Sequence, residues 1–248
     1  MLPLEGVRIL AVEQYGAGPF GTMFLADQGA EVIKIENPTD GGDMARDVGP
    51  HFFAPGDSEF FHSFNRNKRS LTLDLGRDEG LAVFHDLVRT ADGVTCNLRG
   101  DVPAKLGLTY DALKDLNPKI VCAHLTAYGR DGPRATWPGF DFLMQAEAGY
   151  LAVTGEPDAP PARFGLSVVD MMTGVTMAYA FLAGLTAARD TGIGRDVDVS
   201  LFDLALHNTN YLATWYLNEG VNQGRLARSA HPSLIPCQIY PTADGWIF

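Results

Sequence analysis

Short apolar runs alternate along this chain with segments of helical periodicity, and that alternation limits its fold most strongly. The first run, Val7–Val12, ends in a glycine-rich turn, and residues 20–28 follow with apolar side chains at helical spacing. A second run, Glu31–Glu36, precedes a glycine- and proline-rich loop that extends to about residue 58. Further strands are predicted at residues 70–75, 94–97, 120–125 and 196–200, and further helices at residues 78–90, 111–116, 142–148, 169–188 and 201–217. Strands that alternate with helices are typical of βαβ units, so we predict an α/β fold with a mostly parallel sheet.

Charge and cysteine content narrow the possible partners. The chain has 19 Lys and Arg against 30 Asp and Glu, a formal net charge of −11, which argues against binding to nucleic acid or to an anionic membrane. Its three cysteines form no CxxC or zinc-type pattern, so we predict a reducing compartment and no metal site. Residues 1–6 lack the features of a signal peptide, and the uncharged stretch Met171–Ala188 is expected to be a buried helix, so a cytoplasmic protein is predicted.

A GxGxxG pattern, Gly16–Gly21, lies between the first predicted strand and the first predicted helix. Together with Glu36 at the end of the next strand, it matches the fingerprint of dinucleotide-binding enzymes. Pro19 removes one amide donor from the turn that would hold the pyrophosphate. A nicotinamide-dependent oxidoreductase and a simple strand-to-helix turn therefore both remain open.

Asp170 stands at the start of a long apolar helix. A carboxylate there could act as the N-cap, where the helix dipole favours it. It could also act as a nucleophile toward an activated acyl group, because Gly165 and Gly174 would leave room for a substrate.

Segments along the whole chain carry a resemblance to a known family. They are Leu4–Leu10, Gly16–Pro19, Gly29–Glu36, Gly42–Asp43, Phe64–Ser70, Leu116–Pro118, Ala127–Gly129, Gly132–Pro133, Asp170 with Thr173–Gly174, and Thr191–Arg195. In these segments the chain resembles the class III CoA-transferases of the CaiB/BaiF type, which include formyl-CoA transferase and carnitine CoA-transferases. The turn Gly16–Gly21 belongs to this family's own pattern, which removes the main support for the nicotinamide interpretation.

The resemblance implies a Rossmann-like large domain, a smaller α/β domain and an interlocked homodimer. We place the large domain at residues 1–222, and the linker with the beginning of the small domain at residues 223–248. Members of this family are longer, so the chain is expected to be the N-terminal part of a longer enzyme. It would end within a hairpin strand.

The resemblance also implies a function, with Asp170 as the nucleophile. Asp170 would attack an acyl-CoA to give an aspartyl anhydride and then an aspartyl-CoA thioester, from which CoA passes to an acceptor carboxylic acid. Acyl-CoA and the acid would be substrates, and no tightly bound cofactor is expected. Basic side chains that could receive CoA are Arg66, Lys68, Arg69, Arg99 and Lys105. Residues that the resemblance assigns to CoA binding are Gly16, Ala17, Leu73, Leu75, Asn97, Arg99, Lys105, Thr126 and Tyr128.

Departures from the family patterns separate the alternatives. Phe140 stands where α-methylacyl-CoA racemases have a catalytic histidine, and phenylalanine cannot accept a proton, so a racemase is a minor alternative. Residues 229–233 read Ser-Ala-His-Pro-Ser where formyl-CoA transferase has a run of glycines, so another small or medium acid is favoured over oxalate. Outside the transferases, a nicotinamide-dependent oxidoreductase and a non-catalytic CoA-binding module remain as rivals.

Overall fold

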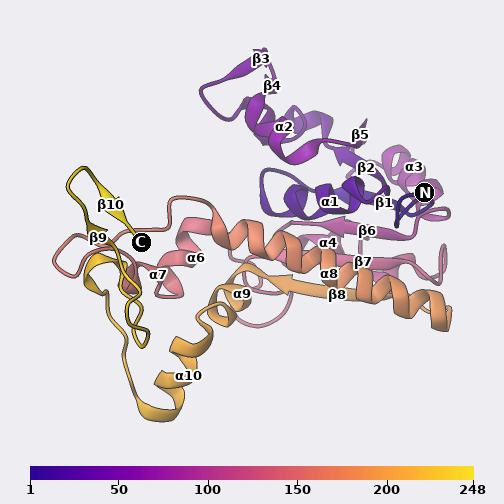
Figure 1. Ribbon diagram of the computed structural model, residues 1–248. Helices are drawn as coiled ribbons and strands as arrows, with labels where there is room; N and C mark the ends of the chain where they lie inside the picture. The colour runs from indigo at the N-terminus through magenta and orange to yellow at the C-terminus, as the bar shows by residue number, and fades with distance from the viewer. The chain divides into compact units, whose positions relative to one another are not determined.

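The computed structural model describes residues 1–248, and they divide into two compact units. The first unit comprises residues 1–139 and 170–201, and the second comprises residues 140–169 and 202–248. A six-stranded sheet runs through the first unit, and every neighbouring pair of its strands is parallel (Figure 1). In spatial order the strands are β5 (Lys68–Thr72), β2 (Glu31–Glu36), β1 (Arg8–Val12), β6 (Gly93–Cys96), β7 (Val121–Thr126) and β8 (Arg195–Ser200). The prediction of an α/β fold with a mostly parallel sheet is confirmed.

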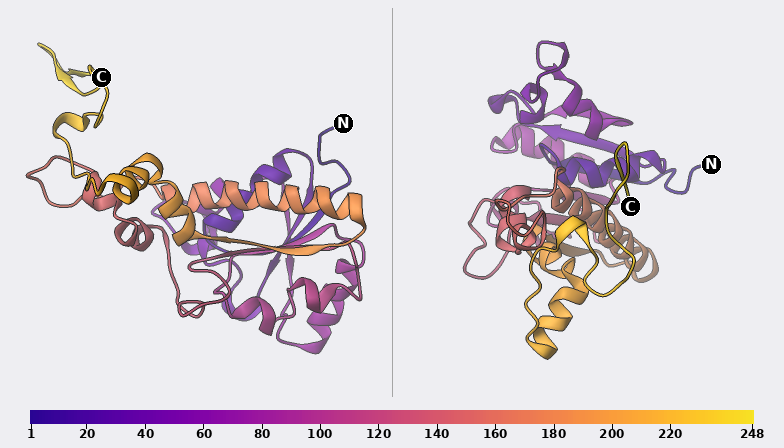
Figure 2. Two further views of the ribbon diagram at one scale, coloured as in Figure 1. Left: turned by 90° about the horizontal axis from the view of Figure 1, so that it is seen from below. Right: turned by 60° about the vertical axis from the view of Figure 1, so that its left-hand side comes forward.

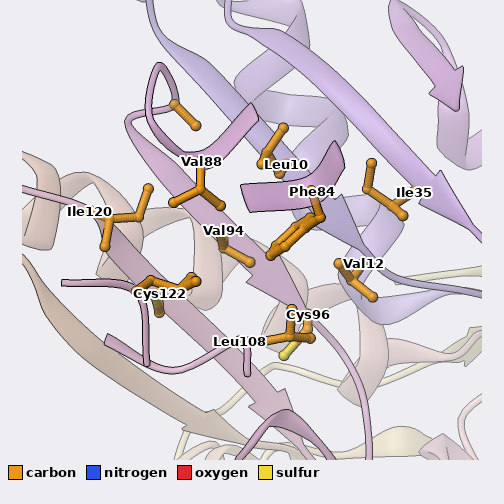
Figure 3. Close-up of a cluster of buried hydrophobic side chains, with 12 residues drawn as sticks. Leu10, Val12, Ile35, Phe84, Val88, Val94, Cys96, Leu108, Ile120 and Cys122 are labelled. Atoms are coloured by element: carbon orange, nitrogen blue, oxygen red, sulfur yellow. The ribbon is translucent and has the colours of Figure 1, made fainter. Parts of the chain in front are cut away.

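The central strands are buried on both faces, as their continuous apolar sequences require. Leu10 and Val12 of β1 point into the core on one face, where Phe84 and Val88 of α3 (Asp78–Val88) pack against them (Figure 3). Cys122 of β7 belongs to the same core. Strand β1 is fully enclosed because its other side chains face the helices on the opposite side of the sheet.

Helices α1 (Ala17–Asp27) and α8 (Val168–Thr191) lie on that opposite face (Figure 2). A methyl group added at Gly93 in β6 would lie 2.2 Å from the ring of Phe181 in α8, so the helix sits directly on the strand. By length and composition α8 is the one helix that could cross a membrane. Since its buried side chains pack on the sheet, it is the core helix that the sequence predicted.

Smaller elements complete the first unit. They are the 3₁₀ helices η1 (Pro38–Asp40) and η2 (Met44–Asp47), the strands β3 (Phe52–Ala54) and β4 (Asp57–Ser58), and the helices α2 (Glu59–Asn65), α4 (Val102–Lys105) and α5 (Tyr110–Leu113). The segment predicted as a loop up to residue 58 therefore contains short ordered elements.

The second unit consists of short helices and a small hairpin. Its elements are α6 (Asp141–Glu147), α7 (Tyr150–Val153), α9 (Leu201–His207), α10 (Asn210–Glu219), η3 (Ala227–Ser229) and the antiparallel pair β9 (Tyr240–Pro241) and β10 (Trp246–Ile247). The domain boundary expected between residues 222 and 223 stays a prediction.

Two predicted elements have different boundaries in the structure. The strand expected at residues 70–75 ends at Thr72, because Asp74 starts a turn in which its side chain accepts the amide of Gly76 at 2.9 Å. The helix expected at residues 201–217 is two helices. The hydroxyl of Thr209 donates to the carbonyl of Leu206 at 2.6 Å, and Asn210 has a φ of 44°, so the helical path breaks there.

Candidate functional site

Two glycines bring the backbones of α1 and α8 into direct contact. A methyl group added at Gly21 would lie 2.3 Å from the carbonyl oxygen of Gly174, and one added at Gly174 would lie 2.4 Å from the carbonyl oxygen of Ala17. No larger residue fits at either position without moving a helix. The contact therefore fixes how the N-terminal turns of the two helices face each other.

One turn earlier on each helix, the same contact brings Gly16 and Asp170 together. Gly16 is the N-cap of α1, and a methyl group added to it would lie 3.4 Å from Oδ2 of Asp170. Asp170 is 9% exposed and lies in the first turn of α8. The first amides of α1 have no acceptor within that helix, so they are available to an anion beside Asp170.

Asp170 is not the N-cap of α8, because the helix begins at Val168. Asp141 serves the start of the helix instead, since its Oδ2 accepts the amide of Val169 at 2.7 Å. The capping interpretation of Asp170 is therefore wrong, and its carboxylate lies beside Gly16 instead.

The loop between β1 and α1 is held from several sides. Asn97, predicted as a CoA contact, accepts the amide of Gln14 at 2.8 Å and donates to its carbonyl at 2.7 Å. Its amide group thus fixes the loop that leads to Gly16. Tyr15 adopts a φ of 67°, a left-handed conformation that costs about 1–3 kcal/mol for a residue with a bulky side chain. Nothing in the sequence marks this conformation, so Tyr15 is not among the predicted site residues.

A cavity of about 230 Å³ opens at the carboxyl ends of the strands. The order in which successive strands join the sheet reverses between β1 and β6, and ligands of open α/β sheets bind at such a switch point. Leu73 and Leu75 line the cavity, as do Leu98 and Leu106. The other residues assigned to CoA binding lie outside this lining.

Arg99 and Lys105 come directly after Leu98 and directly before Leu106, so both lie beside the cavity in the chain. They share one carboxylate: Asp101 accepts from Nε of Arg99 and from Nζ of Lys105, each at 2.5 Å. Hydrogen bonds from Arg99 and then Lys105 hold the pKa of Asp101 well below its usual range. The three exposed or half-exposed groups carry one net positive charge.

Thr126 is the last residue of β7, and Tyr128 lies two residues further along the chain. The hydroxyl of Thr126 accepts the amide of Gly129 at 2.8 Å, so it shapes the turn after the strand. The ring of Tyr128 meets that of Trp137 edge to face at 6.1 Å.

Three of the basic residues predicted for CoA are engaged elsewhere. The side chain of Lys68 is only 2% exposed and binds Glu13 at 2.9 Å, which makes it unavailable to a phosphate. The side chains of Arg66 and Arg69 are exposed and pair with Asp27 and Glu31, respectively. Arg99 and Lys105 are therefore the predicted cations that lie nearest to the cavity along the chain.

Glu36, the acid that a dinucleotide-binding enzyme would use for a ribose, has both oxygens occupied. It accepts two hydrogen bonds from Arg46 at 2.7 and 2.8 Å, one from Ser70 at 2.6 Å and one from the amide of Asp43 at 2.9 Å. Burial raises the pKa of Glu36, but these hydrogen bonds outweigh it and lower the pKa to about 2. The structure gives no support to the nicotinamide interpretation.

Comparison with known proteins identifies relatives over almost the entire chain. Residues 4–248 match the model of CoA-transferase family III. The chain is 41% identical to a succinate–glutarate CoA-transferase of Agrobacterium fabrum, covering 99% of this chain and 62% of that protein. It is 37% identical to a succinyl-CoA:mesaconate CoA-transferase of Haloarcula hispanica, covering 98% and 63%.

A solved structure shows the same fold. A CAIB/BAIF family protein from Brucella suis superposes with a TM-score of 0.90 at 35% identity, covering 99% of this chain and 65% of that one. The chain thus spans somewhat less than two thirds of the length of each of these relatives.

Proposed function

Because the chain belongs to CoA-transferase family III, as its sequence patterns predicted, we propose that it moves CoA from an acyl-CoA to a carboxylic acid through Asp170. One observation carries the proposal. The carboxylate of Asp170 is 9% exposed and lies beside Gly16, which has no side chain to cover it. A carboxylate in that position is suited to nucleophilic attack on an activated acyl group.

In the proposed reaction each bond that breaks is matched by one that forms, and no proton is gained or lost overall. An oxygen of Asp170 attacks the thioester carbonyl, the C–S bond breaks, and CoA thiolate leaves a mixed anhydride. The thiolate attacks the aspartyl carbonyl, which releases the donor acid and forms an aspartyl-CoA thioester. The acceptor carboxylate attacks this thioester, giving a second anhydride, and the thiolate then takes the new acyl group and frees Asp170.

The amides in the first turn of α1 support this chemistry electrostatically. Each attack places negative charge on a carbonyl oxygen, and Ala17 and Gly18 provide helix N-terminal amides near Asp170. The helix dipole of α1 favours the same charge.

CoA has an apolar ring system and several phosphates, and the site offers a place for each. The cavity at the ends of the strands, whose otherwise largely polar wall includes four leucines, is proposed to hold the adenine portion. Arg99 and Lys105 are proposed to contact the phosphates, since Asp101 neutralises only one of the two charges. Gly16, Ala17, Asn97, Thr126 and Tyr128 stay predictions as CoA contacts, and Asn97 would act through the loop that it holds.

Dicarboxylic acids of four or five carbons are the proposed substrates. The named relatives transfer CoA among succinate, glutarate and mesaconate, which all belong to this class. The absence of a side chain at Gly16 leaves space beside Asp170 for an acyl chain. The interlocked homodimer that the resemblance implied stays a prediction, as does the cytoplasmic location predicted from cysteine content and the N-terminal residues.

A trapping experiment tests the role of Asp170. The full-length protein is incubated with succinyl-CoA and then with hydroxylamine, which converts an anhydride or thioester on Asp170 to a hydroxamate. We expect mass spectrometry to find the hydroxamate on the peptide that contains Asp170, and Asp170→Asn to lose both the adduct and CoA transfer to glutarate.

The matched control is Asp190→Asn, which removes an exposed carboxylate from the last turn of the same helix. It should form the adduct at the rate of the unmodified protein. An unmodified Asp170 peptide, or full transfer by Asp170→Asn, would show that transfer does not proceed through this carboxylate. Binding of CoA without any transfer would favour the non-catalytic module instead.

A further inference from the structure

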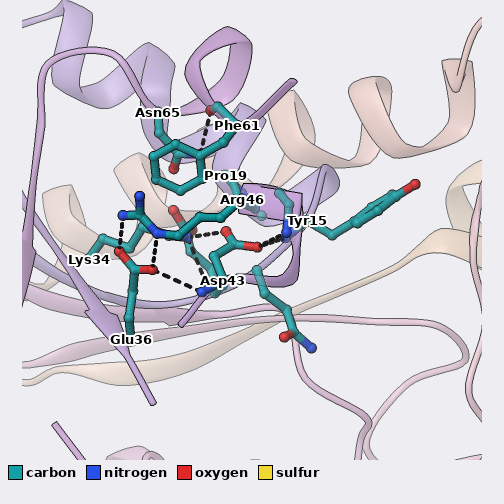
Figure 4. Close-up of polar contacts among 12 residues, drawn as sticks. Tyr15, Pro19, Lys34, Glu36, Asp43, Arg46, Phe61 and Asn65 are labelled. Carbon is teal, nitrogen blue, oxygen red and sulfur yellow. Dashed lines mark hydrogen bonds and ion pairs between the residues drawn. The ribbon is translucent and has the colours of Figure 1, made fainter. Parts of the chain in front are cut away.

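The loop from Glu13 to Gly16 is fixed by side chains that come from three other segments of the chain, and Figure 4 shows two of them, Lys34 and Asp43. Nζ of Lys34 donates to the carbonyl of Glu13 at 2.8 Å, and Asn97 binds both backbone groups of Gln14. The amide of Tyr15 donates to Oδ1 of Asp43 at 2.9 Å. Each residue before Gly16 is thus held through its backbone.

Tyr15 is the residue at which this loop departs from ordinary geometry. Its φ of 67° is unfavourable for a side chain with a Cβ, and such conformations persist only where the surroundings hold them. Its ring does not occupy a deep pocket, because the side chain is 39% exposed and touches Phe60 at a centroid distance of 5.2 Å. The hydrogen bond from its amide to Asp43 is therefore the contact that fixes its backbone.

Asp43 is itself held rigidly. It is 3% exposed, its Oδ1 also accepts the amide of Ala45 at 2.8 Å, and its Oδ2 pairs with the buried ammonium group of Lys34 at 2.7 Å. Its own amide donates to Glu36, which Arg46 binds with two hydrogen bonds. A buried carboxylate with this many partners is far more tightly placed than a helix cap or a surface turn requires.

We propose that Asp43 is a positioning residue that holds Tyr15 in the left-handed conformation and thereby sets Gly16 against Asp170. The inference rests on the proposed function of Asp170. Rotation of Tyr15 to negative φ would turn the peptide that joins it to Gly16 and move Gly16 relative to Oδ2 of Asp170. Displacements of about 1 Å at a reacting group can lower a rate by about 100-fold.

Two substitutions at Asp43 separate positioning from simple stabilisation. Asp43→Asn and Asp43→Ala both lose the ion pair with Lys34, but only asparagine keeps an oxygen that can accept the amide of Tyr15. We expect Asp43→Ala to form the Asp170 adduct at least about 10-fold more slowly than Asp43→Asn. Asp43 lines the cavity and both variants remove its charge there, so the affinity for CoA, measured by calorimetry, should differ less than about threefold between the two.

The control variant is Asp47→Asn, which removes an exposed carboxylate from the same segment and should react like the unmodified protein. If Asp43→Ala does not fold, Tyr15→Val and Tyr15→Asn replace it. Both remove the ring and leave the ion pair intact, but asparagine tolerates positive φ and valine does not. We expect the valine variant to react at least about 10-fold more slowly than the asparagine variant.

Crystal structures of these variants give a readout that does not depend on catalysis. The proposal requires residue 15 to leave positive φ in Asp43→Ala or in Tyr15→Val and to keep it in the corresponding asparagine variant. It is overturned if φ at residue 15 stays positive in the alanine or valine variant, or if the paired variants form the adduct at equal rates. If the unmodified protein forms no adduct, the proposed function fails, while the φ of residue 15 still decides whether Asp43 holds the loop.

Discussion

Replacing Gly174 by alanine tests the backbone contact between α1 and α8 on which the candidate site depends. The new methyl group would lie 2.4 Å from the carbonyl oxygen of Ala17 and 3.0 Å from the amide nitrogen of Gly21. Both neighbours are backbone atoms, so no side chain can rotate to make room. The helices would have to separate by roughly 1 Å to restore normal contact distances.

The stability change is the difference between two opposing effects. Alanine inside a helix is favoured over glycine by about 0.5–1 kcal/mol, whereas overpacking of a tight contact costs about 1–3 kcal/mol. Because the clash involves backbone atoms on both sides, we expect the upper part of that range and a net loss of about 2 kcal/mol. For a chain of this size, such a loss lowers Tm by about 4–8 °C.

Gly184→Ala in the same helix is the matched comparison. Its methyl group would meet the side chains of Val121 at 2.9 Å and Val197 at 3.2 Å, and side chains can adjust where backbone cannot. Replacement of glycine by alanine changes helix propensity equally in both variants, so the difference between their free energies of unfolding isolates the backbone contact. We expect the free energy of unfolding of Gly184→Ala to lie within about 1 kcal/mol of that of the unmodified protein.

Urea unfolding followed by circular dichroism measures the stabilities, and the rate of adduct formation at Asp170 measures the geometry of the site. Gly174→Ala should form the adduct about 100-fold more slowly, since Gly16 and Asp170 move with the two helices. The reasoning would be refuted if Gly174→Ala matched Gly184→Ala both in stability and in rate.

Three further predictions concern other contacts of the first unit. The pKa of Glu36 is about 2 in the folded protein against an ordinary 4.5, so this carboxylate stabilises the fold by up to about 3 kcal/mol above pH 4.5 and loses that effect as the pH falls toward 2. In Glu36→Gln the free energy of unfolding should no longer fall with pH over this range, and an unchanged pH dependence would contradict the assignment. Burial raises the pKa of the Cys96 thiol to about 12, so a thiol reagent should label the partly exposed Cys237 in the folded protein and Cys96 only after unfolding; equal labelling rates would argue against this burial. Asn97→Leu should lower the free energy of unfolding by about 1–3 kcal/mol, because both backbone groups of Gln14 lose their partner, and thermal unfolding at an unchanged temperature would count against that role.

Most of the fold could be predicted from local patterns. Strands such as β7 and helices such as α3 follow directly from apolar runs and helical spacing, because burial of one stripe or of a whole strand leaves a clear pattern. The predicted ends of helices and strands were less accurate where a side chain competes with the backbone for hydrogen bonds. Asp74 and Thr209 end or break predicted elements through hydrogen bonds that depend on the path of the chain around them.

The candidate site was predictable only in part. Asp170 could be found because of its place at the start of a long apolar helix and the family pattern around it, and Leu73 and Leu75 do line a cavity. Asp43 belongs to a segment of the family pattern, but neither its role nor Tyr15 could be found, since their contact joins two segments that are separate in sequence and produces a backbone conformation without a sequence signal. Lys68 was wrongly assigned as a possible CoA ligand, because the sequence does not show that Glu13 binds it inside the protein.

The order of the strands also affects how the chain must fold. Each strand of the sheet pairs in parallel with its neighbours, so no pair can form as a local hairpin. Strands β7 and β8 share six paired positions, yet all of residues 127–194 lie between them in the chain. A sheet built from such distant segments has a high contact order and is expected to fold slowly. On a ribosome, β7 would emerge well before its neighbour β8, leaving one apolar sheet edge exposed until β8 itself had been synthesised.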